Sequence, residues 1–417
     1  MECTLRNRLH ATDTIRGATI QFLDPVTRAV RLTATTNRIG VASLDLKTLP
    51  SGTYTCVIMA PNTFADPVGP ALLASAGAVP ERVYRPVTLT IVRTMRGITS
   101  ATPSNPQHAT VVLAGNHMNV DIQPVWMRSS MSSNRGQAIT MIVVHHTACA
   151  LGPAVNTFLA EKGPHYMIAP DGQIVKWVQD ARSAWHAGSA RWSGYSDVNA
   201  RSIGIEIVHT TGAYPAAQYT ALLELLGRIR TAFSTINAWD IVGHSDVGTN
   251  AGGRLGRKSG DPGAQFEWSR LEDRGLGMQM IIGPPSLNIY AGFFQAVPTG
   301  ALRHGDNDSH HRFGASVRPA ITGTPVRELQ DDLALIGYSV GTPNGVFGED
   351  AQHAVIAFQE HFFAGGRGHK TPDGRVDFQT AAMIKSVASW QAIQTVIAAG
   401  VGGAPAATGA APVGATP

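Results

Sequence analysis

Histidine and carboxylate side chains with the spacing of a metal site occur in the middle of the chain. His145 follows an apolar run, Met141–Val144, that has the character of a buried strand. His244 follows a second apolar pair, and Asp261 lies in a loop rich in glycine and proline. Two histidines and a carboxylate can hold zinc and leave a fourth position open for water, as hydrolysis requires. The chain contains 15 histidines, so spacing alone leaves other ligand sets open.

The adjacent residue, His146, is not expected to bind the same ion. Consecutive strand residues face opposite sides of a sheet, so a regular strand delivers only one of two neighbouring histidines to one site. We therefore expect His146 to pack or to make a supporting hydrogen bond.

A carboxylate, Glu206, interrupts the apolar strand predicted at Ser202–Val208. Burying a carboxylate costs free energy unless the group has a partner or a chemical role, and burial perturbs its pKa. The residues alone leave two interpretations open, a structural ion pair and a functional carboxylate.

Strands that alternate with helices are predicted around these residues. The expected elements are a strand at Ile139–Val144, a short helix near Ala154–Glu161, a hairpin at His165–Trp177 turning at Asp171–Gly172, the strand at Ser202–Val208 and a helix at Ala216–Phe233. This order predicts an α/β domain with a mixed sheet over residues 121–280.

Six short motifs in this region occur in the order of a known family. They are Val143–Ala148, His165–Gly172, Ala184–Gly188, Ser202–Glu206, Gly243–Asp246 and Arg257–Gly263. Over roughly residues 139–270 the chain resembles the zinc-dependent N-acetylmuramoyl-L-alanine amidases, which include bacterial wall-recycling enzymes, phage lysozyme-type amidases and animal peptidoglycan recognition proteins.

The resemblance implies a role for five residues. His145, His244 and Asp261 would bind Zn²⁺, Glu206 would act as the general base, and Lys258 would stabilise the oxyanion. We take His165, Trp185 and His186 as candidate substrate contacts.

Two departures from the family pattern surround the third ligand. The family usually shows Lys-x-Asp, whereas this chain has Lys258-Ser-Gly-Asp261, one residue longer. The preceding segment, Thr249–Gly256, also lengthens the loop between the second and third ligands. Glycines accommodate such insertions, so Asp261 stays the expected ligand, while the longer spacer puts the Lys258 role in doubt.

The N-terminal 120 residues are predicted to be all-β. Short alternating runs are separated by turn signals, and Leu49–Tyr54 resembles the closing hairpin of prealbumin-like and carboxypeptidase-regulatory β-sandwiches. We expect residues 1–120 to form a sandwich-like domain with a structural, targeting or delivery role.

The C-terminal part predicts a small helical unit. The motifs Val326–Leu333, Asn344–Gly348, Ala354–Gln359 and Asp373–Asp377 resemble the three-helix peptidoglycan-binding domain of wall hydrolases over residues 323–387, with Ala351 where threonine is common. Leu329, Leu333, Ala354 and Phe358 are the expected core. Residues 281–322 are expected to be a linker, 388–399 a docked helix, and the end of the 388–417 tail disordered. Two units joined by a linker are expected to have separate cores.

Composition narrows the possible partners. The formal charge is +4 and no basic block occurs, which argues against nucleic acid. No apolar run is long enough to span a membrane, the three cysteines suggest no disulfide framework, and the N-terminus lacks the apolar core of a secretory signal. We therefore expect a protein made in the cytoplasm that acts at the cell wall after delivery by an unidentified route.

These observations predict a zinc hydrolase that cleaves the amide between N-acetylmuramic acid and the first L-alanine of the stem peptide. Peptidoglycan is the expected partner, and a phage tail or secretion-system component is a candidate partner of the N-terminal domain. Both an endolysin and a secreted effector fit this pattern. The alternatives are a non-catalytic peptidoglycan receptor and a cytosolic amidase that recycles soluble muropeptides.

Overall fold

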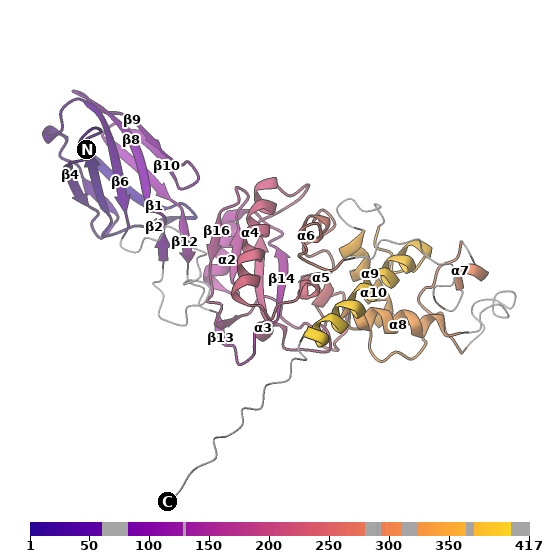
Figure 1. The fold of residues 1–417 in the computed structure, drawn as a ribbon. Coiled ribbons are helices and arrows are strands. Elements are labelled where there is room, and N and C mark those ends of the chain that lie inside the picture. The colour runs from indigo at the N-terminus through magenta and orange to yellow at the C-terminus, as the bar shows by residue number, and fades with distance from the viewer. Residues whose placement is uncertain are drawn as a thin grey trace, which may run out of the picture. The chain divides into compact units, whose positions relative to one another are not determined.

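The structure is a computed structural model that describes residues 1–60, 82–127, 131–279, 290, 293–297, 299–309, 323–363 and 371–401 (Figure 1). The chain divides into two compact units. The first comprises Met1–Gly277 and Ile356–Asp373, and the second comprises Met278–Val355 and Gly374–Pro417. Within the described residues, no helix has the length and hydropathy needed to cross a membrane.

The N-terminal region consists of strands and one 3₁₀ turn (η1, Leu46–Thr48) over the described part of residues 1–122. The strands of its two five-stranded sheets are β1 (Glu2–Asn7), β2 (His10–Thr14), β3 (Thr19–Leu23), β4 (Val30–Thr35), β5 (Val41–Ser43), β6 (Gly52–Met59), β8 (Val87–Thr94), β9 (Gly97–Pro103), β10 (Ala109–Ala114) and β11 (His117–Ile122). One sheet has the order β10-β11-β1-β2 with β5 paired to β1, and the other has the order β4-β3-β6-β8-β9.

Alternation along the strands builds one core between these two sheets. In β6 the side chains of Tyr54, Cys56 and Ile58 are buried while their neighbours are more exposed. In β1 the buried side chains include Cys3 and Leu5. Residues of both sheets belong to the same hydrophobic cluster, because each strand turns one face inward with a period of two.

The central region contains a seven-stranded mixed sheet with the order β19-β14-β18-β15-β16-β12-β7. Its strands are β7 (Arg82–Tyr84), β12 (Pro124–Met127), β14 (Met141–His146), β15 (Tyr166–Ile168), β16 (Ile174–Lys176), β18 (Ser202–Ile207) and β19 (Ile241–Gly243). A separate pair is formed by β13 (Ser132–Asn134) and β17 (Arg182–Ala184). β14 lies between β18 and β19 and is parallel to both.

Helices pack against both faces of this sheet. The helices and 3₁₀ turn of the region are α2 (Leu151–Ala160), α3 (Val198–Arg201), α4 (Ala216–Ala232), η2 (Ala238–Asp240), α5 (His244–Val247) and α6 (Ser269–Glu272). Leu222, Leu225 and Ile229 of α4 share one core with alternate residues of β14 and β18. Residues of α2 share a second core with β15 and β16. The predicted strands, hairpin and helices of this region are present within one to three residues of their expected bounds.

The register of the central strands places the site residues on one face. Ile142 and Val144 of β14 and Ile203 and Ile205 of β18 point into the core beneath α4. The intervening residues must therefore face the other side, because the side-chain period is two. His145 is paired with Glu206 in the parallel ladder, so the two side chains leave neighbouring strands on the same face.

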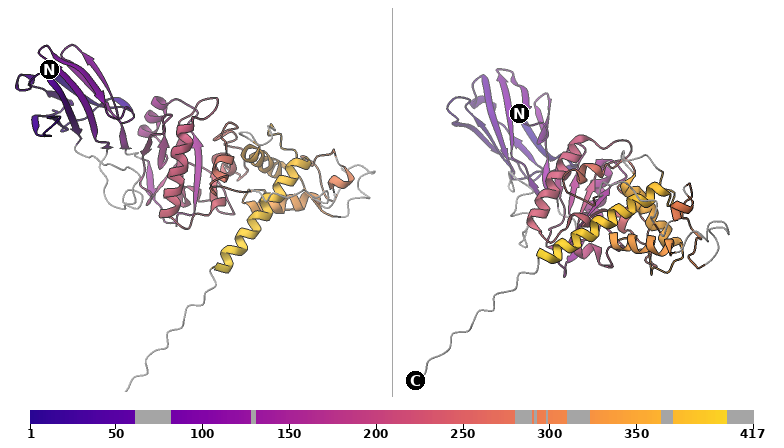
Figure 2. Two further views of the ribbon diagram at one scale, coloured as in Figure 1. Left: turned by 45° about the horizontal axis from the view of Figure 1, so that its top comes forward. Right: turned by 45° about the vertical axis from the view of Figure 1, so that its right-hand side comes forward.

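The C-terminal region is helical, with α7 (Phe293–Ala296), α8 (Pro325–Ile336), α9 (Glu349–Phe362) and α10 (Phe378–Val401), as two further views also show (Figure 2). The four residues expected in its core, Leu329, Leu333, Ala354 and Phe358, are fully buried. The helix expected at 388–399 is not a separate element but the second half of α10, since no glycine or proline interrupts residues 378–399.

The C-terminal region does not follow the expected order of a linker at 281–322 and then a separate helical unit at 323–387. Part of the expected linker pairs with the helical region, because Leu302 exchanges backbone hydrogen bonds with Val376 and Asn307 forms a bridge with Val346. The remainder of the linker lies largely outside the described residues, as does the tail from 402 onward. The boundary between the two compact units falls inside α9, between Val355 and Ile356.

Candidate metal centre and active site

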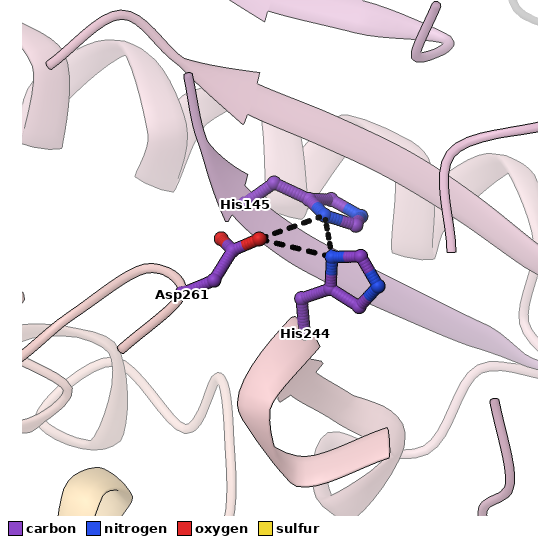
Figure 3. A group of neighbouring side chains, drawn as sticks. All are labelled: His145, His244 and Asp261. Carbon is purple, nitrogen blue, oxygen red and sulfur yellow. Dashed lines mark hydrogen bonds and ion pairs between the residues drawn. The ribbon is translucent and has the colours of Figure 1, made fainter. Parts of the chain in front are cut away.

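The three side chains expected to bind zinc converge at the carboxyl end of the central strands (Figure 3). His145 is the fifth residue of β14, His244 begins α5 directly after β19, and Asp261 lies in the loop that follows. His145 Nδ1 lies 2.8 Å from His244 Nδ1, and His244 Nδ1 lies 2.9 Å from Asp261 Oδ2. The third separation, His145 Nδ1 to Asp261 Oδ2, is 3.8 Å.

This donor set fits a zinc ion. Ligand atoms about 2.0–2.1 Å from a tetrahedral zinc are separated from one another by roughly 3.3 Å, and the three observed separations lie on both sides of that value. Burial and the nearby His244 lower the pKa of His145 to about 4, so this imidazole is neutral and able to donate a lone pair at pH 7. Burial alone would raise the pKa of Asp261, but the neighbouring imidazoles of His145, His146 and His244 outweigh it and hold the pKa well below its ordinary value.

Hydrogen bonds at the far side of each ring determine which nitrogen faces the centre. His244 Nε2 lies 2.9 Å from the carbonyl oxygen of Ala187, which can only accept, so Nε2 carries the proton. His145 Nε2 lies 2.9 Å from His186 Nδ1, and His186 Nε2 lies 3.1 Å from the hydroxyl of Ser202. That hydroxyl donates to Val198 O at 2.6 Å, so it can accept from His186. These directed hydrogen bonds leave Nδ1 of both His145 and His244 unprotonated and able to bind a metal ion.

His146 supports the centre from the other side of the strand. Its backbone N–H donates to Asp261 Oδ1 at 2.9 Å, and its Nδ1 lies 3.4 Å from the same oxygen. Asp261 Oδ2 therefore lies beside Nδ1 of His145 and His244, and Oδ1 accepts from His146. Within the described residues, the cluster able to hold a metal contains His145, His244 and Asp261 but not His146.

Glu206 lies beside the three ligands with an unsatisfied oxygen. Its Oε2 atom is buried and has no hydrogen-bond partner among the described residues. Burial and the neighbouring charge of Asp261 raise the pKa of Glu206 well above its ordinary value, against the opposing effect of Lys258. A buried carboxylate oxygen without a protein donor has an acceptor free for a water molecule or a substrate group.

A cavity of about 540 Å³ opens over this group of residues. Its lining includes Glu206, His244, Lys258 and Asp261. Lys258 can reach this position because Gly248 leaves space for its stem: a Cβ on Gly248 would lie 2.8 Å from Lys258 Cβ. The lining thus combines two of the three potential metal ligands, His244 and Asp261, with a second carboxylate and an ammonium group, which is a set suited to hydrolysis.

The three candidate substrate contacts occupy different environments. His165 is fully buried, accepts from Gly204 N at 2.9 Å through Nδ1, and lies 2.7 Å from Arg135 through Nε2, so its ring has no surface left for a substrate. His186 borders the cavity, but both its nitrogens bind protein groups. Trp185 is 39% exposed and borders a second groove of about 390 Å³. Of the three, only Trp185 offers a substantial exposed side chain.

Sequence reasoning missed Arg257, which donates hydrogen bonds to three backbone carbonyl groups near His244. Its Nη2 atom donates to Ala187 O at 2.5 Å and to Ser189 O at 3.0 Å, and its Nε atom donates to Thr249 O at 2.8 Å. The carbonyl of Ala187 is also the acceptor for His244 Nε2. The only signal in the sequence was the position of Arg257 directly before Lys258, which does not reveal three carbonyl partners elsewhere in the chain.

Comparisons with known proteins agree with this geometry. Residues 135–264 match the family model described as N-acetylmuramoyl-L-alanine amidase, and residues 322–384 match the one described as putative peptidoglycan binding domain. The 1,6-anhydro-N-acetylmuramyl-L-alanine amidase AmpD of Escherichia coli K12 is 35% identical over 127 residues, which are 29% of this chain and 65% of that protein. The N-acetylmuramoyl-L-alanine amidase AmiD of the same organism is 27% identical over 157 residues, or 33% of this chain and 54% of that protein.

Solved structures of such amidases are similar in part. The structure of AmiD from E. coli covers 67% of this chain and 97% of its own, with 22% identity and a TM-score of 0.43. A structure of Citrobacter freundii AmpD covers 36% of this chain and 88% of its own, with 27% identity and a TM-score of 0.29. The matches to AmpD and AmiD in sequence span less than two thirds of the length of those relatives. Residues 135–264 of the chain are therefore similar to the N-acetylmuramoyl-L-alanine amidase family, and residues 322–384 are similar to the putative peptidoglycan binding domain family.

Proposed function

We propose that the protein is a zinc-dependent N-acetylmuramoyl-L-alanine amidase that hydrolyses the bond between the lactyl group of N-acetylmuramic acid and the L-alanine of the stem peptide. One observation carries the proposal: the potential ligand atoms of His145, His244 and Asp261 converge, and Glu206, with an unpartnered oxygen, lines the same cavity as His244 and Asp261. The match of residues 135–264 to the amidase family supports the choice of bond.

Each residue of the site has a separate role in the proposed reaction. His145, His244 and Asp261 would hold a zinc ion, which would supply the Lewis-acid chemistry for polarising a carbonyl and lowering the pKa of water towards about 7. Glu206 accepts a proton from the attacking water at its free Oε2 and delivers it to the leaving amine nitrogen. The Lys258 ammonium, which borders the same cavity, stabilises the negative charge that develops on the carbonyl oxygen. The products are a carboxylic acid and an amine, so one water is consumed.

The outer parts of the chain define where the enzyme works. We assign residues 323–387 to wall binding, since 322–384 match a putative peptidoglycan binding domain. Residues 1–120 are assigned to targeting or delivery, and the prealbumin-like relationship stays a prediction from Leu49–Tyr54. A phage tail or secretion-system partner for this region likewise stays a prediction.

The same amide bond occurs in two kinds of substrate, small muropeptides and the peptidoglycan polymer. The name of the AmpD relatives points to 1,6-anhydro-N-acetylmuramyl-L-alanine as a substrate. The C-terminal domain favours the polymer instead, because a soluble substrate needs no wall anchor. A non-catalytic receptor is disfavoured, since the complete ligand set and Glu206 are present.

The test uses the full-length zinc-loaded protein on a soluble muropeptide and on purified sacculi. Mass spectrometry should show the stem peptide released with a free L-alanine amine. The variant Glu206→Gln should keep its zinc and lose activity by about 10²- to 10⁴-fold, the range for a positioned acid–base group. Near-wild-type turnover by Glu206→Gln would rule out its role as base, and cleavage at another bond would rule out the proposed activity.

A further inference from the structure

The loop that carries Lys258 and Asp261 is held by a residue of the C-terminal region. Glu360, near the end of α9, accepts hydrogen bonds from Ser259 Oγ through Oε1 and from Gly260 N, at 3.0 Å, through Oε2. Ser259 and Gly260 are the two residues between Lys258 and Asp261. One carboxylate therefore binds both residues of the spacer that is longer than the family pattern.

The spacer forms a tight turn whose third residue is a glycine. Gly260 has a φ of +79°, in the left-handed region that glycine adopts at least cost. Asp261 N donates to Lys258 O at 3.1 Å, which closes a tight turn between the two functional residues. Gly260 N points at Glu360 instead of at a neighbouring carbonyl. The conformation of the turn, and with it the separation of Lys258 from Asp261, thus depends on an acceptor outside the loop.

The next residue of α9 makes a second connection to the centre. His361 Nδ1 lies 2.8 Å from Asp246 Oδ2, and both side chains are almost completely buried. The same Asp246 oxygen accepts from Gly243 N at 2.7 Å, directly before His244. The ring of His361 also stacks on Trp268, with centroids 3.9 Å apart and an interplanar angle of 14°. These contacts place the second half of α9, which belongs to the first compact unit, against the elements that carry two of the three ligands.

Taking the function proposed above as the basis, we propose that Glu360 is a positioning residue for amide hydrolysis: by binding Ser259 and Gly260 it fixes Lys258 and Asp261 relative to each other. The wall-binding domain would then contribute to the catalytic site as well as to localisation. Glu360 acts through the loop and does not touch the reacting atoms. Its removal should therefore affect metal binding and turnover more than substrate affinity.

The experiment compares full-length Glu360→Ala, Glu360→Gln and Ser259→Ala with the wild type and with Gln352→Ala, a control on the first half of α9. Zinc affinity is measured by competition with a fluorescent chelator, and kcat and KM are measured on a soluble muropeptide. Glu360→Ala should weaken zinc binding and lower kcat by about 10- to 100-fold, the range for residues that orient metal ligands, with KM changed less than about twofold. Glu360→Gln keeps a side-chain acceptor and should recover part of the loss. Ser259→Ala keeps the Gly260 bond and should lose less than Glu360→Ala.

The outcomes separate this proposal from the proposed function. An active wild type together with a Glu360→Ala variant of unchanged kcat and zinc affinity would overturn the positioning role and leave the amidase activity standing. A wild type without amidase activity would refute the function, while the zinc affinities would still decide whether Glu360 orders the loop. If Glu360→Ala does not fold, Glu360→Gln and Ser259→Ala decide: wild-type zinc affinity and kcat in both would refute the proposal.

Discussion

At the scale of single residues, hydrogen bonds behind the two histidines decide their protonation. His145 and His244 both turn Nδ1 toward the centre because Nε2 of each ring is bound to a protein group, His186 and the carbonyl of Ala187 respectively. Imidazole can donate a lone pair from only one nitrogen in its neutral form. The partners of the distal nitrogen therefore select the ligand atom.

Zinc content should follow this assignment. His145→Ala and His244→Ala should lose most of their metal, because two remaining protein ligands compete poorly with water. His146→Ala is the matched control and should keep its zinc, since the shorter bond to Asp261 comes from its backbone N–H. Metal analysis after dialysis measures the difference. Full occupancy in both ligand variants would contradict the assignment.

The charge of the partly buried Glu206 should also affect stability. Burial raises its pKa in the folded protein, so the ionised form opposes folding once the pH exceeds the ordinary value of about 4.3. In the metal-free protein, Glu206→Gln should therefore increase the free energy of unfolding at pH 7, and the increase should shrink as the pH falls to about 4. Denaturant titrations at several pH values provide the measurement. A stabilisation that does not depend on pH would exclude this cause.

At the scale of elements, parallel pairing of β14 and β18 brings the chemistry together. The ladder aligns Val143 with Gly204 and His145 with Glu206, so the ligand and the carboxylate are neighbours across the sheet. The ring of His186 lies directly over Gly204, where a Cβ would come within 2.3 Å of His186 Cγ. The absence of a side chain at Gly204 leaves the space in which His186 reaches His145.

Two glycine substitutions should therefore have opposite effects. Gly204→Ala should lower the free energy of unfolding by about 1–3 kcal/mol, the usual cost of overpacking, and displace His186. Gly227→Ala, in the exposed interior of α4 with nothing within 4 Å of the added Cβ, should raise it by roughly 0.5–1 kcal/mol. Chemical unfolding of the full chain compares the two. Equal stability of Gly204→Ala and the wild type would show that His186 moves without cost.

At the scale of the whole molecule, the three cysteines differ in their exposure to solvent. Cys3 and Cys56 lie in the shared core of the two N-terminal sheets, while Cys149 is half-buried at the edge of the catalytic cavity. Burial raises the pKa of the Cys3 thiol to about 12 and also raises that of Cys56. The thiolate is the reactive form of cysteine. Burial therefore slows the reaction of these two thiols in two ways, because it blocks access of a reagent and keeps the thiols protonated.

Thiol titration of the native protein at pH 8 should reveal this difference. One thiol, Cys149, should react quickly with an aromatic disulfide reagent, and all three should react in denaturant. The Cys149→Ser variant is the control and should leave no fast-reacting thiol. Fast reaction of two or three thiols in the native wild type would mean that the N-terminal core is open.

The sequence by itself determined the central elements and the set of chemical groups. Apolar periodicity predicted the strands ending at His145 and before His244, and period two separated His145 from His146. These patterns involve residues that are close in the sequence, so they can be recognised without knowing the tertiary structure. The ordered motifs added the candidate ligands, and the structure brings His145, His244 and Asp261 together.

Only the tertiary structure decided how these groups are supported. Three supporting hydrogen bonds join residues that are far apart in the sequence. The separation is 41 residues for His186 and His145, 70 for Arg257 and Ala187, and 101 for Glu360 and Ser259. The linker and the motif boundaries predicted that the catalytic and C-terminal regions have separate cores. The boundary between the two compact units instead lies inside α9, whose second half belongs to the first unit. Local patterns carry no information on which distant polar groups will meet, because those pairs are set by packing of the whole chain. His165 illustrates the limit: its motif suggested a substrate contact, and burial against Arg135 and Gly204 makes it part of the sheet's support.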